Sequence, residues 1–255
     1  MHCQRDFAGI IFIGIYPQLR STQIPVTDPA AGLRITEIFY SLQGEARDSG
    51  YPTVFIRLTG CPLRCSYCDT AYAFEGGTRR ALADIMASVT EFGTAQQVRH
   101  VCVTGGEPLA QPNCIPLLTE LCDAGYAVSL ETSGAIDVAA VDPRVSKVLD
   151  LKTPDSGEMQ RNLLSNLPLL TTHDQIKFVI TSRHDYEWSR DMLKMHGLDK
   201  LVGEVWFSPS FAIEPGQVRL PMLARDLADW IVADKLPVRF QLQLHKLLWQ
   251  DEAGR

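Results

Sequence analysis

The segment CPLRCSYCDT, residues 61–70, places three thiols within eight residues. This spacing lets one loop wrap Cys61, Cys65 and Cys68 around a single metal centre, but it provides no local fourth ligand. A structural zinc site usually takes four protein ligands as two pairs that are well separated in sequence, and no second pair follows Cys68. An iron–sulfur cubane is normally held by four thiolates, so three thiolates would leave one iron open to another ligand.

Three alternatives to a cubane remain for this segment: a zinc knob, a disulfide staple, or three core cysteines that cluster by chance. An unclustered cysteine is usually a small buried hydrophobe, and we expect this role for Cys102, Cys114 and Cys122. The motifs described below favour the cubane over all three alternatives.

The composition limits the class of protein. The chain has 255 residues, of which 45% are hydrophobic and 21% charged, as in an ordinary globular protein. Its net charge of −6 offers no basic field for phosphates, so direct binding of nucleic acid is disfavoured. The seven cysteines, an odd number, fit a reducing compartment better than a disulfide framework. These features predict a cytoplasmic protein.

Residues 1–33 differ in pattern from the rest of the chain. The apolar run 8–16 is too short to span a bilayer, and Pro17, Pro25 and Pro29 then interrupt any helix. A signal peptide is an alternative, but it conflicts with a reducing compartment. We expect an irregular N-terminal extension of unknown role, followed by a core domain over residues 34–255 that does not bind a membrane.

Strand and helix patterns alternate through the core domain, which predicts an α/β protein with a parallel sheet and right-handed crossovers. The cysteine loop, Lys152 and Ser208 all follow strands, at the sheet edge where such enzymes place their active sites. About six strand–helix units are too few for a closed eight-fold barrel. The expected strands cover residues 33–40, 53–58, 99–103, 126–131, 147–151, 175–180, 204–207 and 238–242. The expected helices cover residues 81–92, 114–123 and 223–234, with another polar helix ending near residue 196.

Two further features of the core domain suggest ligand contacts. Arg57 interrupts the apolar strand 53–58, and a buried arginine requires an anionic partner. An ion pair within the protein and a carboxylate-bearing substrate both remain open as that partner. The loop 104–108 (TGGEP) carries two consecutive glycines after a strand, which allow a close backbone approach to a ligand. Alone, this glycine pair is weak evidence.

The cysteine spacing, with the aromatic Tyr67 before its last cysteine, and the GGEP sequence one strand–helix unit later resemble the radical S-adenosylmethionine (SAM) superfamily. The resemblance implies a partial (β/α) barrel of about six strands and a 4Fe–4S cluster on Cys61, Cys65 and Cys68. It also implies that the amino and carboxylate groups of SAM cap the open iron. An electron from a flavodoxin-like or equivalent donor would then cleave SAM to methionine and a 5′-deoxyadenosyl radical.

Further motifs resemble one family in this superfamily, 7-carboxy-7-deazaguanine synthase. They are the segments 42–45 (LQGE), 68–70 (CDT), 104–108 (TGGEP), 131–134 (ETSG) and 243–246 (QLHK), together with Arg57. The resemblance implies an enzyme, expected to be a homodimer, that contracts 6-carboxy-5,6,7,8-tetrahydropterin to 7-carboxy-7-deazaguanine with loss of ammonia. That product is a precursor of queuosine in tRNA.

The family resemblance also implies site residues. The set that would hold the pterin and its carboxylate is Leu42, Gln43, Gly44, Arg57 and Thr104. The set that would surround SAM is Tyr67, Cys68, Asp69, Gly106, Asp150, Leu151, Lys152, Ser208, Pro209 and Ser210. Thr70 would ligate a magnesium ion together with substrate oxygens and water. In the implied mechanism the adenosyl radical abstracts the C6 hydrogen of the pterin, and return of hydrogen regenerates SAM. The sequence singles out no acid–base residue.

Two rival functions remain open at this point. A glycyl-radical enzyme activase shares the cysteine loop and GGEP, but it often carries additional ferredoxin-like cysteines that this chain lacks, and the LQGE segment argues against it. A zinc-stabilised binding module is the rival that is not an enzyme. Iron and sulfide near about four per chain would support the cubane, whereas stoichiometric zinc would support the module.

Overall fold

The computed structural model describes residues 32–210, 222–250, 252 and 254. The expected N-terminal extension, residues 1–33, therefore lies outside the described residues except for its last two, which begin strand β1 (Gly32–Leu42). Leu33, the second residue of β1, is fully buried in the hydrophobic core.

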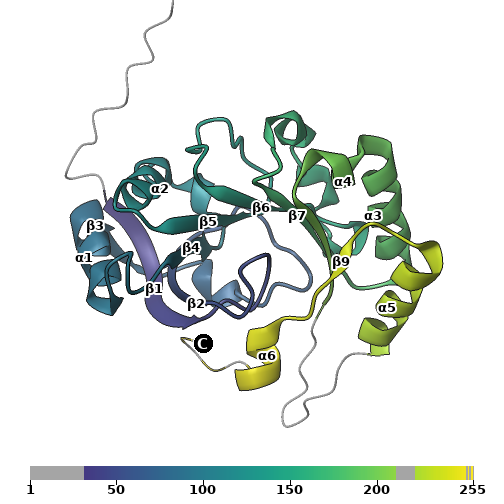
Figure 1. Ribbon diagram of the computed structural model, residues 1–255, viewed down its shortest axis with the longest axis horizontal. Helices are drawn as coiled ribbons and strands as arrows, with labels where there is room; N and C mark the ends of the chain where they lie inside the picture. Colours follow the sequence, from purple (N-terminus) through teal and green to yellow (C-terminus); the bar gives the residue numbers. More distant parts are fainter. Residues whose placement is uncertain (1–31, 211–221, 251, 253, 255) are drawn as a thin grey trace, which may run out of the picture.

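The strands of the described residues form a nine-stranded sheet in the order β3-β1-β2-β4-β5-β6-β7-β8-β9 (Figure 1). From β2 to β9 neighbouring strands run parallel, whereas β1 is antiparallel to β2, and β3 (Thr78–Ala81) is antiparallel to β1. Because the parallel strands follow one another in chain order, each crossover moves the chain one position along the sheet. Their bounds are β2 Pro52–Leu58, β4 His100–Gly105, β5 Ala127–Thr132, β6 Ser146–Asp150, β7 Gln175–Ile180, β8 Glu204–Pro209 and β9 Arg239–Phe240.

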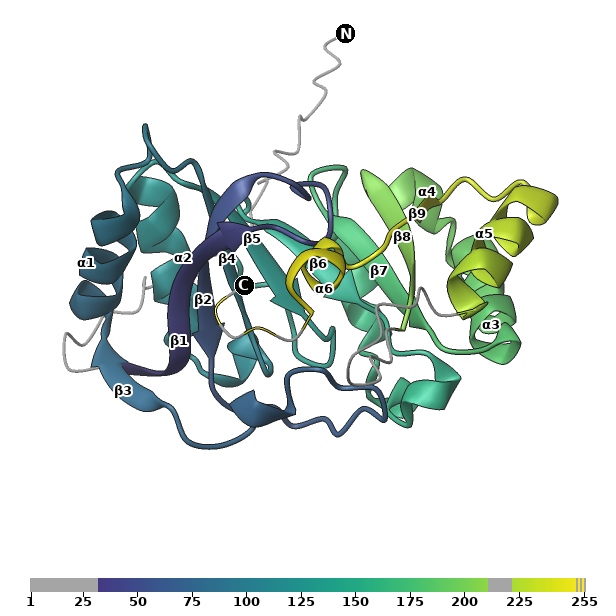
Figure 2. The ribbon, with the colours of Figure 1, turned by 90° about the horizontal axis from the view of Figure 1, so that it is seen from below.

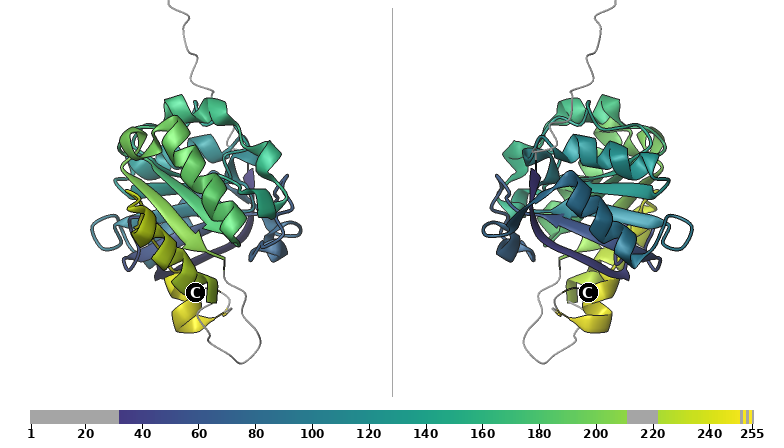
Figure 3. Two further views of the ribbon diagram at one scale, coloured as in Figure 1. Left: turned by 90° about the vertical axis from the view of Figure 1, so that its right-hand side faces the viewer. Right: turned by 90° about the vertical axis from the view of Figure 1, so that its left-hand side faces the viewer.

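Helices lie on the outside of the curved sheet at both of its ends, α1 and α2 at one end and α3 and α4 at the other (Figure 3). Helix α6 lies apart from them, between β1 and β9 on the open side of the sheet (Figures 1 and 2). An α/β fold with a partial, open barrel is thus confirmed. The helices are α1 Leu82–Phe92, α2 Cys114–Asp123, α3 Arg183–His196, α4 Leu198–Leu201, α5 Met222–Asp234 and α6 Leu244–Trp249. Short 3-10 turns occur at η1 Ala71–Ala73, η2 Pro108–Ala110, η3 Pro154–Ser156, η4 Met159–Arg161 and η5 Leu164–Leu169.

Alternation along the central strands separates the core from the cavity. In β7, Ile176 and Phe178 are fully buried in the hydrophobic core, whereas the intervening Lys177 lines a cavity on the opposite face. Successive residues of a strand point to opposite faces, so one strand can serve both sides. Cys114 is fully buried in the hydrophobic core and Cys122 packs against it, as expected, and Cys102 is also fully buried.

Some elements differ from the sequence expectations. The edge strand β3 was not predicted, because its short polar segment TRRA has no apolar periodicity. The short helices α4 and α6 were not predicted either. The last expected strand, residues 238–242, is shortened to the two residues of β9 at the sheet edge. Among the described residues, no helix has the length and apolarity that crossing a bilayer requires.

Candidate active site

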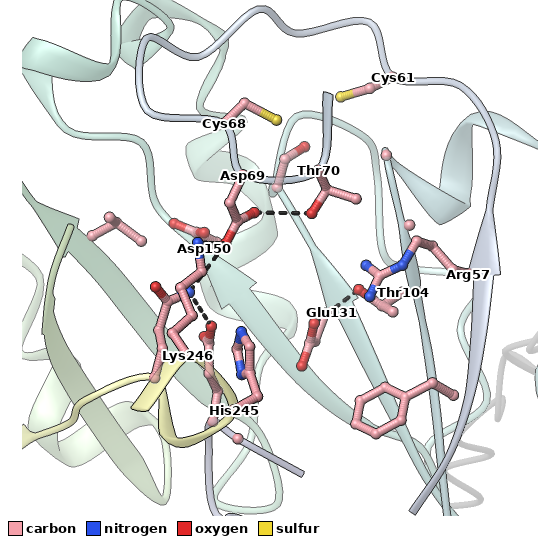
Figure 4. Close-up of a pocket in the computed structure, with 18 of the residues that line it drawn as sticks. Arg57, Cys61, Cys68, Asp69, Thr70, Thr104, Glu131, Asp150, His245 and Lys246 are labelled. Atoms are coloured by element: carbon pink, nitrogen blue, oxygen red, sulfur yellow. Dashed lines mark hydrogen bonds and ion pairs between the residues drawn. The ribbon is translucent and has the colours of Figure 1, made fainter. Parts of the chain in front are cut away.

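A cavity of about 410 Å³ opens at the carboxyl ends of the parallel strands. Figure 4 shows the thiols of Cys61 and Cys68 at one end of this cavity, and Glu131 and His245 at the other. The predicted site residues that line it are Leu42, Gln43, Gly44, Arg57, Cys61, Cys65, Tyr67, Cys68, Asp69, Thr70, Thr104, Gly106, Asp150, Lys152 and Ser210. Residues that are far apart in sequence thus meet at one edge of the sheet, as the strand order predicts.

Three of the predicted SAM contacts, Leu151, Ser208 and Pro209, do not line the cavity. Leu151 lies between two lining residues, Asp150 and Lys152, and its side chain is fully buried in the hydrophobic core. Ser208 is also buried, within β8, and Pro209 is the last residue of that strand. Only Ser210, the next residue along the chain, reaches the cavity wall.

The cysteine loop provides a set of thiols that a single zinc ion does not suit. Two thiolates on one zinc ion are at most about 4.6 Å apart, because each Zn–S bond is about 2.3 Å long. Among the described residues, one group of three side chains has its possible metal-ligand atoms all within 4.8 Å of one another. This group is Asp155, His184 and Asp185, and the cysteines do not form such a group. The thiols of Cys61 and Cys68 face each other across the end of the cavity (Figure 4). A larger centre such as a cubane fits this wider set.

The three thiols of the loop are free and only partly exposed. Burial raises the pKa of the Cys61 thiol, and it raises the pKa of the Cys65 thiol to about 11. A thiolate is the form that binds a metal, so metal binding at these positions would have to release the proton. In the absence of a metal, Cys65 is a thiol at neutral pH.

Gly105 and Gly106 lie against the start of the cysteine loop. A Cβ atom on Gly105 would lie 2.2 Å from the carbonyl oxygen of Leu58, and one on Gly106 would lie 2.2 Å from that of Gly60. The Glu107 backbone N–H donates to the Gly60 carbonyl oxygen at 2.8 Å, which fixes this approach. The glycine pair is therefore required for the contact between the two loops, besides any contact with a ligand.

Glu107 of the GGEP segment joins two loops of the site and does not face the cavity. Its fully buried carboxylate accepts hydrogen bonds from the Leu109 N–H, the Thr132 hydroxyl, and both the N–H and the hydroxyl of Ser133. Each of these partners is a donor, so a carboxylate, which only accepts, satisfies all of them.

We expect the substitution Glu107→Gln to lower the free energy of unfolding by about 3 kcal/mol, because the amide NH2 would face hydrogen-bond donors in a buried site. Urea denaturation of the metal-free protein, followed by tryptophan fluorescence, measures the change. Glu91→Gln, on the exposed surface of α1, is the control and should change the stability by less than about 0.5 kcal/mol. Equal stability of the two variants would contradict the role assigned to Glu107.

Arg57 has an anionic partner within the protein. Its Nε donates to Glu37 Oε1 at 2.7 Å, and its guanidinium carbon lies 5.7 Å from the centre of the Phe39 ring and 5.8 Å from that of the Tyr72 ring. The ion-pair alternative is therefore present in the structure. Arg57 nevertheless lines the cavity, and Figure 4 shows its terminal nitrogens on the side of Thr104 and Glu131.

Glu131 is a cavity residue that begins the ETSG motif, but no contact with a ligand was predicted for it. Its carboxylate accepts from the Thr104 hydroxyl at 2.8 Å and from Gln43 Nε2 at 3.3 Å, so it joins two of the predicted pterin contacts. The available signal was its place near the end of strand β5, at the same sheet edge as the GGEP loop.

The segment around α6, which contains the QLHK motif, forms a further wall of the cavity, although no residue of it was among the predicted site residues. The Leu244 N–H donates to the Gly44 carbonyl oxygen at 3.0 Å, and a Cβ on Gly44 would lie 2.1 Å from Nδ1 of His245. Lys246 Nζ lies 3.3 Å from Asp69 Oδ2. Burial tends to raise the pKa of Asp69, but the Lys246 ammonium, the hydrogen bond from Thr70 and further neighbours together hold that pKa below its usual range. The LQGE, CDT and QLHK segments therefore form one contiguous surface.

Asp150 and Lys152 form a charged pair beside Tyr67. Lys152 Nζ lies 3.0 Å from Asp150 Oδ2 and 5.9 Å from the centre of the Tyr67 ring. Burial tends to lower the pKa of Lys152, but the Asp150 carboxylate together with Tyr67 and Cys65 raises it above the usual value, so the ammonium stays charged. The other oxygen, Asp150 Oδ1, is buried and has no hydrogen-bond partner among the described residues. A buried acceptor without a partner is costly, and a ligand donor would satisfy it.

Comparison with known proteins identifies the superfamily and the proteins that this chain resembles. The model of the radical SAM superfamily matches residues 55–195. A 7-carboxy-7-deazaguanine synthase of Koribacter versatilis is 42% identical over 225 residues, which cover 86% of this chain and 98% of the relative. A protein of the same name from Chlorobaculum tepidum is 42% identical over 229 residues, which cover 88% of this chain and 97% of the relative.

A solved structure supports the fold. The crystal structure of QueE from Escherichia coli matches with a TM-score of 0.67 at 24% sequence identity, covering 84% of this chain and 95% of that chain. At this identity the match shows a shared fold.

Proposed function

The chain belongs to the 7-carboxy-7-deazaguanine synthase family of the radical SAM superfamily, and we propose that it converts 6-carboxy-5,6,7,8-tetrahydropterin to 7-carboxy-7-deazaguanine with release of ammonia. The observation that carries the proposal is that one cavity is lined by the three thiols, the glycine pair and Arg57. Figure 4 shows polar side chains at both ends of this cavity, with Cys61 and Cys68 at one end and Glu131 and His245 at the other.

The cluster end of the cavity suits a 4Fe–4S centre on Cys61, Cys65 and Cys68. When bound, the cluster and SAM together supply the one-electron cleavage that starts radical chemistry. The residues of this chain then have three tasks: to hold the reactants, to orient them, and to keep quenching groups and bulk water away. For SAM, we assign contacts to Tyr67, Cys68, Asp69, Gly106, Asp150, Lys152 and Ser210, with Leu151, Ser208 and Pro209 as the backbone beside them.

The opposite end of the cavity suits the pterin. We assign its contacts to Leu42, Gln43, Gly44, Arg57 and Thr104, where the cationic fork of Arg57 matches a planar carboxylate. A magnesium ion would take the hydroxyl oxygen of Thr70 as a ligand. That hydroxyl lines the cavity and donates its hydrogen to Asp69 Oδ1 at 2.9 Å, so its lone pairs remain for a cation.

Further parts of the proposal concern the surroundings of the enzyme. We expect a reducing, cytoplasmic setting, because a cluster with an open iron would be lost under oxidation. A flavodoxin-like or equivalent donor would supply the electron. A homodimer is the expected assembly, and light scattering coupled to size-exclusion chromatography tests it.

Anaerobic turnover of the purified protein with the carboxytetrahydropterin, SAM and a reductant tests the proposed reaction. The expected result is a 7-carboxy-7-deazaguanine product, higher turnover with magnesium, and no stoichiometric consumption of SAM. Steady formation of 5′-deoxyadenosine without a deazapurine product would instead indicate a different radical SAM reaction.

We expect Arg57→Ala to raise KM for the pterin at least about tenfold while it changes the dissociation constant of SAM less than about threefold, because the variant removes the cation that faces the pterin carboxylate. Steady-state kinetics and equilibrium binding of SAM measure the two effects. Arg47→Ala is the control, since Arg47 is paired with Glu204 and does not line the cavity. Equal losses of pterin and SAM affinity in Arg57→Ala would contradict the assignment.

A further inference from the structure

A row of six charged side chains crosses the wall of the cavity. It contains three carboxylates, Asp150, Glu45 and Asp69, and three ammonium groups, Lys152, Lys177 and Lys246. The members come from the end of β6, the middle of β7, the LQGE loop, the cysteine loop and α6, and all of them line the cavity. Equal numbers of opposite charges make the row neutral.

Lys177 is the central member of this row. Its Nζ lies 2.6 Å from Glu45 Oε2 and 3.6 Å from Asp150 Oδ2, so one ammonium serves two carboxylates. Asp150 is the register partner of Lys177 across the parallel pair β6 and β7. Burial tends to raise the pKa of Glu45, but the Lys177 ammonium together with the other charged and hydrogen-bonding neighbours of Glu45 holds that pKa below its usual value. Glu45 is therefore ionised at neutral pH.

The two carboxylates belong to different parts of the cavity. Glu45 directly follows Leu42, Gln43 and Gly44, which we assign to the pterin, whereas Asp150 carries the unpartnered oxygen that we assign to SAM. Gln243 Nε2 extends the row, because it donates to Glu45 Oε1 at 2.7 Å and to Asp69 Oδ2 at 3.2 Å. An unbroken set of polar contacts thus runs from the β6 end to the cysteine loop.

We propose that Lys177 is a positioning residue that holds the Glu45 and Asp150 carboxylates together and thereby fixes the pterin-facing and SAM-facing walls of the cavity relative to each other. This inference rests on the proposed function, because it uses the identity of both ligands. The inference predicts that one substitution of Lys177 weakens the binding of both the pterin and SAM. A residue that contacts only one ligand would not give this result.

The chain offers a matched control for the loss of a buried ammonium. Lys147 lies on β6 and pairs with Asp174 Oδ1 at 2.9 Å, and the exposed fraction of its side chain is 7%, compared with 12% for Lys177. Lys147 is the second residue of β6, near the amino end of that strand, and it does not line the cavity. Lys147→Met and Lys177→Met therefore remove the same charge and the same type of buried ion pair. They differ in whether that pair belongs to the cavity wall.

The test compares Lys177→Met, Lys147→Met, Glu45→Gln and Asp150→Asn in the cluster-loaded full chain. The measurements are KM for the pterin, KM for SAM, the dissociation constant of SAM by equilibrium dialysis, and iron content. We expect Lys177→Met to raise both KM values and the SAM dissociation constant at least about tenfold at normal iron content. Glu45→Gln should raise mainly the pterin KM, and Asp150→Asn mainly the SAM KM.

Lys147→Met should leave both KM values within about twofold of wild type, even where its melting temperature falls. The proposal is overturned if Lys177→Met behaves like Lys147→Met, or if it affects one ligand alone. If Lys177→Met does not fold, Lys177→Met/Glu45→Gln replaces it, because this double variant removes one charge of each sign. It must bind SAM at least about tenfold more weakly than Glu45→Gln, or the proposal fails. Failure of the proposed function is a separate outcome, in which wild type and Lys147→Met form no deazaguanine.

Discussion

The substitution Cys65→Ser should abolish formation of 7-carboxy-7-deazaguanine. It should also reduce the iron and sulfide content from about four of each per chain to less than about one. The chain provides three thiols for the cluster, and a serine hydroxyl is a poorer ligand than a thiolate for an iron–sulfur cluster. The nearest buried carboxylate of the GGEP loop, Glu107, is saturated by its own hydrogen bonds. Loss of one thiol therefore leaves too few ligands to retain a cubane. Iron and sulfide analysis after anaerobic reconstitution measures this result.

The control for this prediction is Cys122→Ser, which alters a half-buried cysteine on α2 that packs at the core and does not line the cavity. This variant should keep the iron content and the turnover of the wild type. If Cys65→Ser retained a full complement of iron and sulfide, the assignment of the three cysteines as ligands would be wrong. Stoichiometric zinc in the wild type would contradict it as well.

The second large effect is expected for Gly106→Ala, which should lower kcat/KM for SAM at least about 100-fold. The added Cβ would lie 2.2 Å from the Gly60 carbonyl oxygen and 2.8 Å from the Cys61 Cβ, and both neighbours are held in place by the loop itself. The cysteine loop must therefore move by a large part of an ångström. A displacement of this size moves a cluster ligand, and overpacking also costs about 1–3 kcal/mol of stability.

Gly197→Ala separates this clash from a general effect of replacing a glycine. Gly197 has a φ of +58° at the end of α3, and a Cβ there meets no atom within 4 Å. We expect Gly197→Ala to lower the free energy of unfolding by about 1 kcal/mol through backbone strain and to leave turnover unchanged. If Gly106→Ala kept normal kcat/KM for SAM, the close approach of the GGEP loop to the cysteine loop would not matter for the reaction.

The sequence was sufficient for the parts of the site that depend on local spacing and strand order. The cysteine spacing and the glycine pair are local patterns, and in a parallel sheet the residues that follow successive strands share one edge. This rule correctly brings Arg57, Thr104, Asp150 and Lys152 to the same cavity. It does not determine side-chain direction, and Leu151 therefore points into the core although both of its neighbours line the cavity.

Contacts between distant segments could not be predicted from one sequence. Lys177 reads as one polar residue in the apolar strand QIKFVI, and only the structure places Glu45 within 2.6 Å of it. The pairing of Lys246 with Asp69 depends on how the chain returns across the open side after β9. Arg57 was ambiguous for the same reason, since its partner Glu37 comes from a neighbouring antiparallel strand whose register the sequence does not give.

The central claim is that three thiols hold a cubane whose remaining iron is open to SAM. Mössbauer spectroscopy of anaerobically prepared, iron-57-enriched protein, recorded with and without SAM, tests this claim most directly. The account predicts one 4Fe–4S cluster per chain, in which one iron site changes its spectrum when SAM is added and the other sites do not. A cluster whose iron sites all remain unchanged by SAM, or protein that holds no cluster at all, would contradict it.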